Sequence, residues 1–280
     1  IAYLTSHEYA LQDTPGAYDM IVSRSEPFTG VLIRYDVEKP LVREKVSVHV
    51  RDAVGAVEYA FIGAGSYAQG SLLPNIPKND DIIARGVMTS SGTGSRSVAE
   101  KFGFQFCTSD KDEIFSASDI NTLFVSTRHD SHAMYVLEGL KAGKNVFVEK
   151  PLCLTLTEFE EIEQAYREKT EAGLSPMLMI GFNRRFAPLA TKVKERLSDG
   201  PLSVIYRINS GAIPAGNWIQ DMEIGGGRIV GEVCHFIDFI TYMASSLPIR
   251  IFASAMPDPD NHNDTIIINV ECENGSIGSI

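Results

Sequence analysis

A glycine loop between a strand and a helix constrains this fold most. Residues 57–62 form a run of apolar and β-branched residues typical of a strand, and the loop follows directly. Gly63 permits a tight turn, Gly65 lets the backbone approach a pyrophosphate, and Ala68 allows close packing of helix on strand. A plain structural turn is the alternative. We expect the loop to bind a dinucleotide through Gly63, Gly65, Ser66, Tyr67 and Ala68.

Strands and helices alternate on short connections after this loop. This alternation predicts a doubly wound parallel sheet, a Rossmann fold. The expected strands are 57–62, 81–88, 121–126, 145–148 and 177–180, and the expected helices end near 73 or span 97–102, 131–142 and 156–170.

The pattern changes after residue 182. Few helices separate the expected strands 203–209, 250–255 and 264–272, and Asn274-Gly275 is typical of a two-residue hairpin turn. These features predict a second α+β domain with an open, mainly antiparallel sheet.

The chain is long enough for two domains of ordinary size. We expect a segment at 1–52, with a helix at 17–23, a strand at 30–35 and a linker from 38. A dinucleotide-binding domain at 53–182 and a substrate and oligomerisation domain at 183–280 follow. The last domain is expected to be truncated, because the sequence stops inside an apparent strand.

Composition excludes some classes of partner. With 25 basic and 36 acidic residues the net charge is −11, so nucleic acid and anionic membranes are disfavoured. The sequence contains no long uninterrupted apolar run, so we expect no membrane-spanning segment. The four cysteines form no CxxC pair, which favours reduced thiols and a cytoplasmic location.

The end of the second expected strand bears on cofactor choice. NAD-specific folds usually place a carboxylate there for the ribose 2′-hydroxyl, whereas this chain has Thr89 and Ser90, followed by Arg96. Hydroxyl groups and an arginine suit a 2′-phosphate, so the sequence slightly favours NADP and leaves NAD open. Alternatively, Arg96 is a solvated charge.

Two further strand ends carry candidate chemistry, because ligands of open α/β sheets bind beyond the carboxyl ends of the strands. One is the turn 126–132, and the other is Glu149-Lys150-Pro151. The Lys150 ammonium could bond a substrate hydroxyl and relay a proton. Taken by itself, Lys150 is better interpreted as an ordinary surface lysine.

A helix expected over 231–238 adds an acid–base candidate. Glu232, His235 and Asp238 are three residues apart and share one face. A histidine beside carboxylates suits general acid–base work, and a buried structural histidine is the alternative.

The substrate candidates lie around this helix. Trp218 offers an aromatic face to a sugar ring, or packs within its own domain. Arg184 and Arg185 suit a phosphate or carboxylate, or pair with acidic residues. His129 and His132 lack further ligands at metal spacing, so we expect no metal and assign them to the helix start and to cofactor contact.

These motifs together resemble the glucose–fructose oxidoreductase and inositol dehydrogenase (Gfo/Idh/MocA) family. The resemblance covers about 57–280 and rests on the glycine loop, 127–132, Glu149-Lys150-Pro151, 181–186 and 231–238. It implies a Rossmann domain and a second domain whose open sheet supports homo-oligomers. It also implies that Lys150 contacts nicotinamide and substrate, and that Thr127, His132 and Glu149 line the cofactor.

One position departs from the family pattern. The family usually has an aspartate four residues before His235, where this chain has Gly231, and Glu232 comes one place later. Either Glu232 takes over that role or the proton relay is altered. Lys150, His235 and Glu232 are our catalytic candidates, and Arg185, Trp218 and Asp238 our substrate candidates.

Residues 1–36 resemble something else, the tail of a zinc-type alcohol dehydrogenase domain. The resemblance rests on 17–20 and 27–33. Two-domain bacterial proteins join such a domain to the family above, often near polysaccharide genes. This piece carries no glycine loop or zinc ligands, so we assign it no catalysis.

The resulting hypothesis is an NAD(P)-dependent oxidoreductase acting on a hydroxyl or carbonyl group of a sugar or nucleotide sugar. One alternative is a catalytically silent nicotinamide-binding regulator, which the missing aspartate favours and the retained Lys150 and His235 oppose. Another is an elimination or hydrolysis that recycles a tightly held cofactor.

Overall fold

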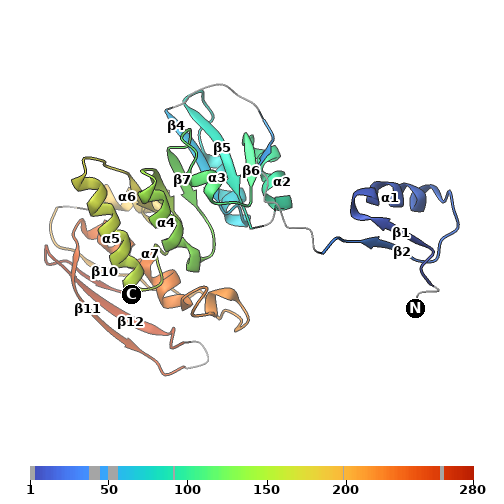
Figure 1. Ribbon diagram of the computed structural model, residues 1–280. Coiled ribbons are helices and arrows are strands. Elements are labelled where there is room, and N and C mark those ends of the chain that lie inside the picture. The colour runs from blue at the N-terminus through green and yellow to red at the C-terminus, as the bar shows by residue number, and fades with distance from the viewer. Residues whose placement is uncertain (1–3, 38–44, 50–55, 91, 198, 259–261) are drawn as a thin grey trace. The chain divides into compact units, whose positions relative to one another are not determined.

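The computed structural model describes residues 4–37, 45–49, 56–90, 92–197, 199–258 and 262–280. The chain divides into two compact units, Ile1–Arg43 and Glu44–Ile280 (Figure 1). Among the described residues, no helix is both long enough and apolar enough to cross a bilayer. All four cysteines are free.

The first unit contains a short parallel sheet and one helix. Strands β1 (His7–Ala10) and β2 (Val31–Arg34) pair in parallel, and the 3₁₀ turn Leu11–Asp13 leads into α1 (Thr14–Ser23). Pro15 in the first turn suits a helix start, because its missing N–H has no partner there in any helix. The expected helix and strand are confirmed, and β1 is additional.

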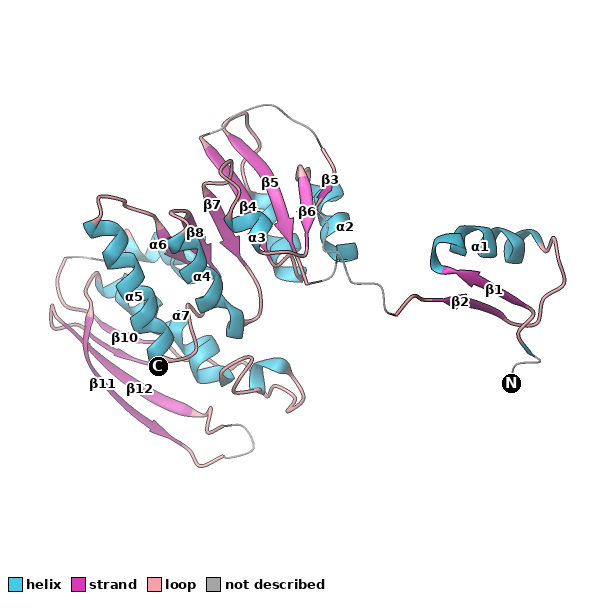
Figure 2. Ribbon diagram, in the orientation of Figure 1, coloured by secondary structure: helices cyan, strands magenta, loops and turns pink. Residues whose placement is uncertain are grey.

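The second unit is built on a seven-stranded sheet with the order β3-β6-β5-β4-β7-β8-β9. All neighbours are parallel except β3 and β6 (Figure 2). The predicted parallel sheet is confirmed. Its strands are β3 (Val46–Ser47), β4 (Val57–Ile62), β5 (Ile82–Met88), β6 (Phe106–Thr108), β7 (Thr122–Val125), β8 (Asn145–Val148) and β9 (Leu178–Ile180).

Helices cover both faces of this sheet because alternate residues of β4 point to opposite sides. Ala60 and Ile62 join one apolar core, whereas Tyr59 and Phe61 join the other. The helices are α2 (Gly92–Phe102), α3 (Asp112–Phe115), α4 (His132–Lys141) and α5 (Leu156–Glu171). The helix expected to end near residue 73 is a π-helical turn, Ala68–Leu72, followed by a 3₁₀ turn, Leu73–Asn75.

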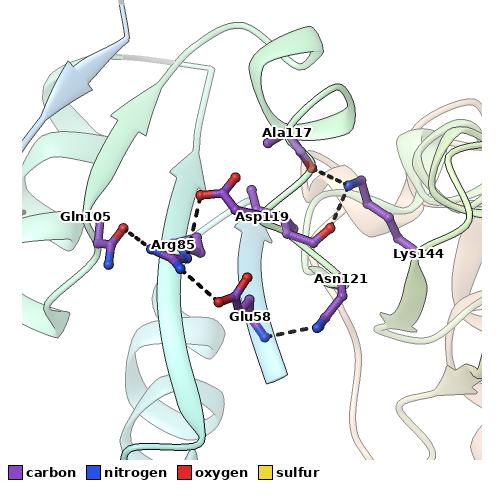
Figure 3. A network of polar contacts seen from close by, with 8 residues as sticks. Glu58, Arg85, Gln105, Ala117, Asp119, Asn121 and Lys144 are labelled. Carbon is purple, nitrogen blue, oxygen red and sulfur yellow. Dashed lines mark hydrogen bonds and ion pairs between the residues drawn. The ribbon is translucent and has the colours of Figure 1, made fainter. Parts of the chain in front are cut away.

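A buried polar network joins strands β4 and β5 to the segments that lead into β7 and β8 (Figure 3). Arg85 donates to Glu58 at 2.8 Å and to Gln105 at 2.7 Å. Lys144 donates to the carbonyl oxygens of Ala117 and Ile120 at 2.8 and 2.7 Å. Glu58 lies at the start of β4 and Lys144 lies just before β8. The network therefore stabilises the amino-terminal ends of these strands, opposite the glycine loop.

The second sheet has the order β10-β13-β12-β11, with β10 (Ser203–Ile205), β11 (Pro248–Ala255), β12 (Ile266–Cys272) and β13 (Ile277–Ser279). Two pairs are antiparallel and β10 is parallel to β13. Helix α7 (Cys234–Ala244) covers one face, and α6 (Pro188–Lys194) precedes β10. Phe252 and Ile267 are exposed, so the sheet is open as predicted.

Three details differ from the sequence predictions. Val46–Ser47 pairs with β6, so part of the predicted linker 38–52 is an edge strand and the sheet begins before residue 53; most of the remaining linker lies outside the described residues. Residues 44–280 form one compact unit, so the boundary at 182/183 stays a prediction. Four residues, 273–276, separate β12 from β13, and Gly275 among them is left-handed (φ 84°), so the connection is longer than the expected two-residue turn.

Candidate active site

The glycine loop lies at the point where the order of the parallel strands reverses, between β4 and β7. Gly63 has a φ of 83°, and a Cβ built on it would lie 2.5 Å from the carbonyl oxygen of Ser126. Only glycine fits there without displacing the backbone. At Gly65 a Cβ would meet nothing within 4 Å, which leaves space beside the backbone, and Ala68 is fully buried. This geometry fits a dinucleotide phosphate group.

The exposed side of the loop reaches towards the end of β9. Ser66 and Tyr67 are exposed, and Asn183 Nδ2 donates to the Tyr67 hydroxyl at 3.2 Å. A phosphate on this loop would therefore lie near residues that lead into the second sheet.

The residues beyond β5 carry no carboxylate. The amide of Thr89 donates to the Thr108 carbonyl at 3.3 Å, and Ser90 is exposed. Arg96 Nε donates to Glu100 at 2.9 Å along the surface of α2, and this bond raises the pKa of Arg96. The arginine considered for a 2′-phosphate thus already has an exposed carboxylate partner.

Lys150 forms an ion pair with Glu232, another of the predicted catalytic residues. Its Nζ donates to the Gly231 carbonyl at 3.0 Å and lies 3.3 Å from Glu232 Oε1. The side chains are 18% and 32% exposed, so the pair is partly shielded and still accessible. The structure brings the end of β8 and the start of α7 together as a charged pair.

His235 lies on the buried side of α7 at 5% exposure. The pKa of His235 is lowered to about 4, mainly by burial and also by the charges of Lys150 and Arg184, against the opposing charge of Glu232. Nδ1 is buried with no hydrogen-bond partner among the described residues. A neutral imidazole of this kind can accept a proton.

Thr127 and His132 belong to one closed turn after β7. Ser131 donates to the Thr127 hydroxyl at 2.7 Å. His132 is fully buried; its Nδ1 lies 2.7 Å from the Pro151 carbonyl and its Nε2 3.3 Å from that of Thr127. The ring thus holds the turn against the Lys150–Pro151 bend, and the expected cofactor contact of His132 stays a prediction.

Glu149 faces the start of the Gly181–Phe186 motif. A Cβ on Gly181 would lie 2.7 Å from Glu149 Oε1, so this glycine leaves room for the carboxylate. Burial raises the pKa of Glu149. Phe182, which follows Gly181, packs edge-on against the His235 ring, with the two ring centres 6.0 Å apart.

Two substrate candidates bind each other. Arg185 Nε donates to Asp238 Oδ2 at 3.0 Å, and a second contact completes a bidentate pair. Trp218 packs edge-on against His129 at 4.8 Å, with the Arg128 guanidinium 5.7 Å from its ring centre. These contacts favour internal packing for all three residues, and substrate contact stays a prediction.

Sequence reasoning missed the importance of His129. The ring is 7% exposed, and its Nδ1 lies 2.8 Å from the Gly225 carbonyl oxygen. The two partners are 96 residues apart, so no local pattern links them.

An apolar cavity of about 590 Å³ lies between α6, β10 and α7, lined by Arg184, Tyr206, Phe239 and neighbouring apolar residues. Lys150, Glu232 and His235 are not part of its lining. Within the described part of the chain, His, Cys, Asp and Glu form no group of three or more suited to a metal.

Known proteins match both the sequence and the fold. Myo-inositol 2-dehydrogenase of Thermotoga maritima is 26% identical over 214 residues, which are 74% of this chain and 62% of that protein. The uncharacterized oxidoreductase YrbE of Bacillus subtilis is 26% identical over 227 residues, which are 78% of this chain and 64% of that protein. The chain thus spans about three fifths of the length of the curated relatives it matches.

Solved structures share the fold. A putative myo-inositol dehydrogenase from Sinorhizobium meliloti 1021 superposes with a TM-score of 0.63 at 22% identity, over 80% of this chain and 68% of that one. Levoglucosan dehydrogenase in complex with NADH and levoglucosan superposes with a TM-score of 0.65 at 22% identity, over 80% of this chain and 65% of that one. Residues 57–175 match the profile described as oxidoreductase family, NAD-binding Rossmann fold. Residues 57–175 are therefore similar to the NAD-binding Rossmann domain of the Gfo/Idh/MocA family.

Proposed function

We propose that this chain carries the cofactor site and the catalytic side chains of an NAD(P)-dependent dehydrogenase acting on a CH–OH group of a sugar, polyol or nucleotide sugar. The observation that carries the proposal is the Lys150 ammonium, held at the end of β8 by Gly231 and Glu232. It lies at the carboxyl edge of the parallel sheet, where such folds bind ligands. The names of the inositol and levoglucosan dehydrogenases support the substrate class.

The residues present fit a nicotinamide dinucleotide. Gly63, Gly65, Ser66 and Tyr67 would hold the pyrophosphate, and Thr127 would lie beside the nicotinamide half. When bound, the nicotinamide exchanges a hydride with the substrate carbon.

The protein's own side chains manage the proton. Lys150 donates a hydrogen bond to the substrate oxygen, and Glu232 keeps the ammonium in place. His235, neutral because of burial, accepts the hydroxyl proton during oxidation and returns it during reduction. The Glu232 carboxylate next to Lys150 supports the enzyme over the silent regulator.

Cofactor binding is the first test. Purified chain is titrated with NADH and NADPH while nicotinamide fluorescence is followed. Gly65→Leu should abolish saturable binding, whereas Gly16→Leu is the matched control, since both glycines face open space. A folded wild-type chain that binds neither cofactor would refute the proposal.

Catalysis is tested by screening myo-inositol, levoglucosan and nucleotide sugars for cofactor reduction. Lys150→Ala and His235→Ala should each lower kcat by about 100-fold or more while the cofactor Kd stays nearly constant. Full activity in both variants would show that the hydride reaction does not use this site. Turnover without net cofactor reduction would instead support the elimination or hydrolysis alternative.

We infer a modest preference for NADPH, supported by hydroxyl side chains at 89 and 90 and by Arg96 nearby. The Glu100 partner competes for the guanidinium. Arg96→Gln should therefore lower the NADPH preference and Glu100→Gln should raise it, measured as the ratio of the two Kd values. Unchanged ratios would place Arg96 outside the site.

A further inference from the structure

One short turn supplies both acceptors of the Lys150 ammonium. The π-helical turn Ile229–Val233 precedes α7 and includes the Gly231 carbonyl and the Glu232 carboxylate, at 3.0 and 3.3 Å from Nζ. Turns of this type occur often at functional sites, and their wider winding needs support from neighbouring groups. The position of Lys150 therefore depends on what holds this turn.

The His129 imidazole supports the turn from another direction. A Cβ on Gly231 would lie 3.1 Å from His129 Cε1, 3.4 Å from its Nδ1 and 3.6 Å from the Gly225 carbonyl oxygen. The ring therefore packs against the α-carbon of Gly231. Alanine at this position would need the ring to move by a few tenths of an ångström.

The ring has little freedom to move. Its Nδ1 lies 2.8 Å from the Gly225 carbonyl, and Trp218 packs edge-on at 4.8 Å. The next amide, of Asp130, donates to the Ile224 carbonyl at 3.0 Å. Three contacts thus fasten the turn after β7 to the segment 218–225.

The ring is also neutral. The pKa of His129 is lowered to about 4, mainly by burial and also by His132 and Lys150, while the hydrogen bond to Gly225 and the charge of Glu232 oppose the shift. Because a carbonyl only accepts, Nδ1 carries the proton in the neutral tautomer. A neutral ring adds no repulsion to the nearby ammonium.

We propose that His129 is a positioning residue for the Lys150–Glu232 pair, and that His129 and Gly231 require each other. The ring, anchored on Gly225, supports the Gly231 backbone and so fixes both acceptors of the ammonium. Glycine at 231 leaves the space that the ring occupies. The inference rests on the proposed function only for what the Lys150–Glu232 pair does.

The test measures Lys150 without requiring turnover. The chain is labelled with the acetyl ester of N-hydroxysuccinimide, and the labelling rate of Lys150 is measured by peptide mass spectrometry against the exposed Lys78. Variants are His129→Ala, Gly231→Ala and the double variant, with Gly216→Ala as control because its Cβ would meet open space. Circular dichroism and the NADH Kd report folding.

Both single variants should label Lys150 faster than wild type, because the turn loses its support or is pushed aside. The double variant should label more slowly than either single one, since the methyl group at 231 enters the vacated space. His129→Asn keeps a donor for the Gly225 carbonyl but loses the ring atom Cε1 that faces Gly231, so it should also label Lys150 faster than wild type and replaces His129→Ala if that variant fails to fold. In a variant that also turns over a screened polyol, kcat should fall by about tenfold or more with an unchanged cofactor Kd.

Unchanged labelling in the single variants, or a double variant at least as fast as the faster single one, would overturn the proposal. A wild-type chain that binds no cofactor and oxidises no polyol would refute the proposed function instead. The labelling pattern would still decide whether His129 positions Lys150, so the two failures are distinguishable.

Discussion

Acid should destabilise this protein through its two buried histidines near Lys150. The pKa of His129 and that of His235 are each lowered to about 4, mainly by burial, against about 6.5 in the unfolded chain. Between these values the unfolded state binds protons that the folded state rejects. Stability is therefore retained above pH 6.5, lost as the pH falls from 6.5 towards 4, and not lost further below that on their account.

The magnitude follows from the two pKa values. On lowering the pH from 7.5 to 5.0, each histidine contributes a loss of about 2 kcal/mol in the free energy of unfolding. Both side chains are nearly fully buried, so solvent screening is small. The pair together should remove about 4 kcal/mol, a large share of ordinary domain stability.

Urea unfolding at the two pH values, followed by circular dichroism, measures this loss. His235→Gln should lose about 2 kcal/mol less than wild type over the interval, and His129→Gln/His235→Gln about 4 kcal/mol less, whatever their stability at pH 7.5. Carboxylates that also titrate cancel in the comparison. If the double variant loses as much as wild type, the histidines are not the groups responsible.

Three further predictions concern other parts of the second unit. Glu58→Met leaves the buried Arg85 guanidinium without its 2.8 Å partner and should cost about 3 kcal/mol, or roughly 6–12 °C in Tm, with an unchanged NADH Kd; a shift below about 2 °C would contradict the network in Figure 3. Gly63→Ala meets the Ser126 carbonyl at 2.5 Å in a left-handed conformation and should abolish NADH binding, measured by fluorescence titration, at a cost of about 1–3 kcal/mol in urea. Phe252→Lys on the open sheet should shift any oligomer seen by analytical ultracentrifugation towards the monomer, and an unshifted distribution would exclude this face as the contact.

The sheet could be predicted from the sequence because its signals are local. The expected bounds of β4 and β8 agree with the structure, since each strand is a short apolar run closed by a loop or a charged turn. The glycine loop directly follows a strand and precedes a helical segment, as its role requires. In contrast, β3 has only two residues, which pair with Phe106 and Cys107 of β6, so the strand is too short to show a side-chain pattern.

The candidate site was predicted as a set of residues but not as a set of contacts. The spacing of Glu232 and His235 placed them on one face, and their common neighbour Lys150 follows from the family order of motifs. The Arg185–Asp238 pair joins residues 53 apart, and each had been assigned separately to the substrate. Opposite charges on separate elements cannot be paired until the elements are placed in space.

The glycines around the site show the same limit most clearly. Three of them leave space that a distant group occupies: Gly63 for the Ser126 carbonyl, Gly181 for the Glu149 carboxylate and Gly231 for the His129 ring. Only Gly63 has a positive φ and lies in a loop that a motif explains. The other two are glycines because of a neighbour, not because of a turn. In the sequence, Gly231 therefore reads as a missing aspartate, whereas in the structure it is the position that lets His129 reach the turn holding Lys150.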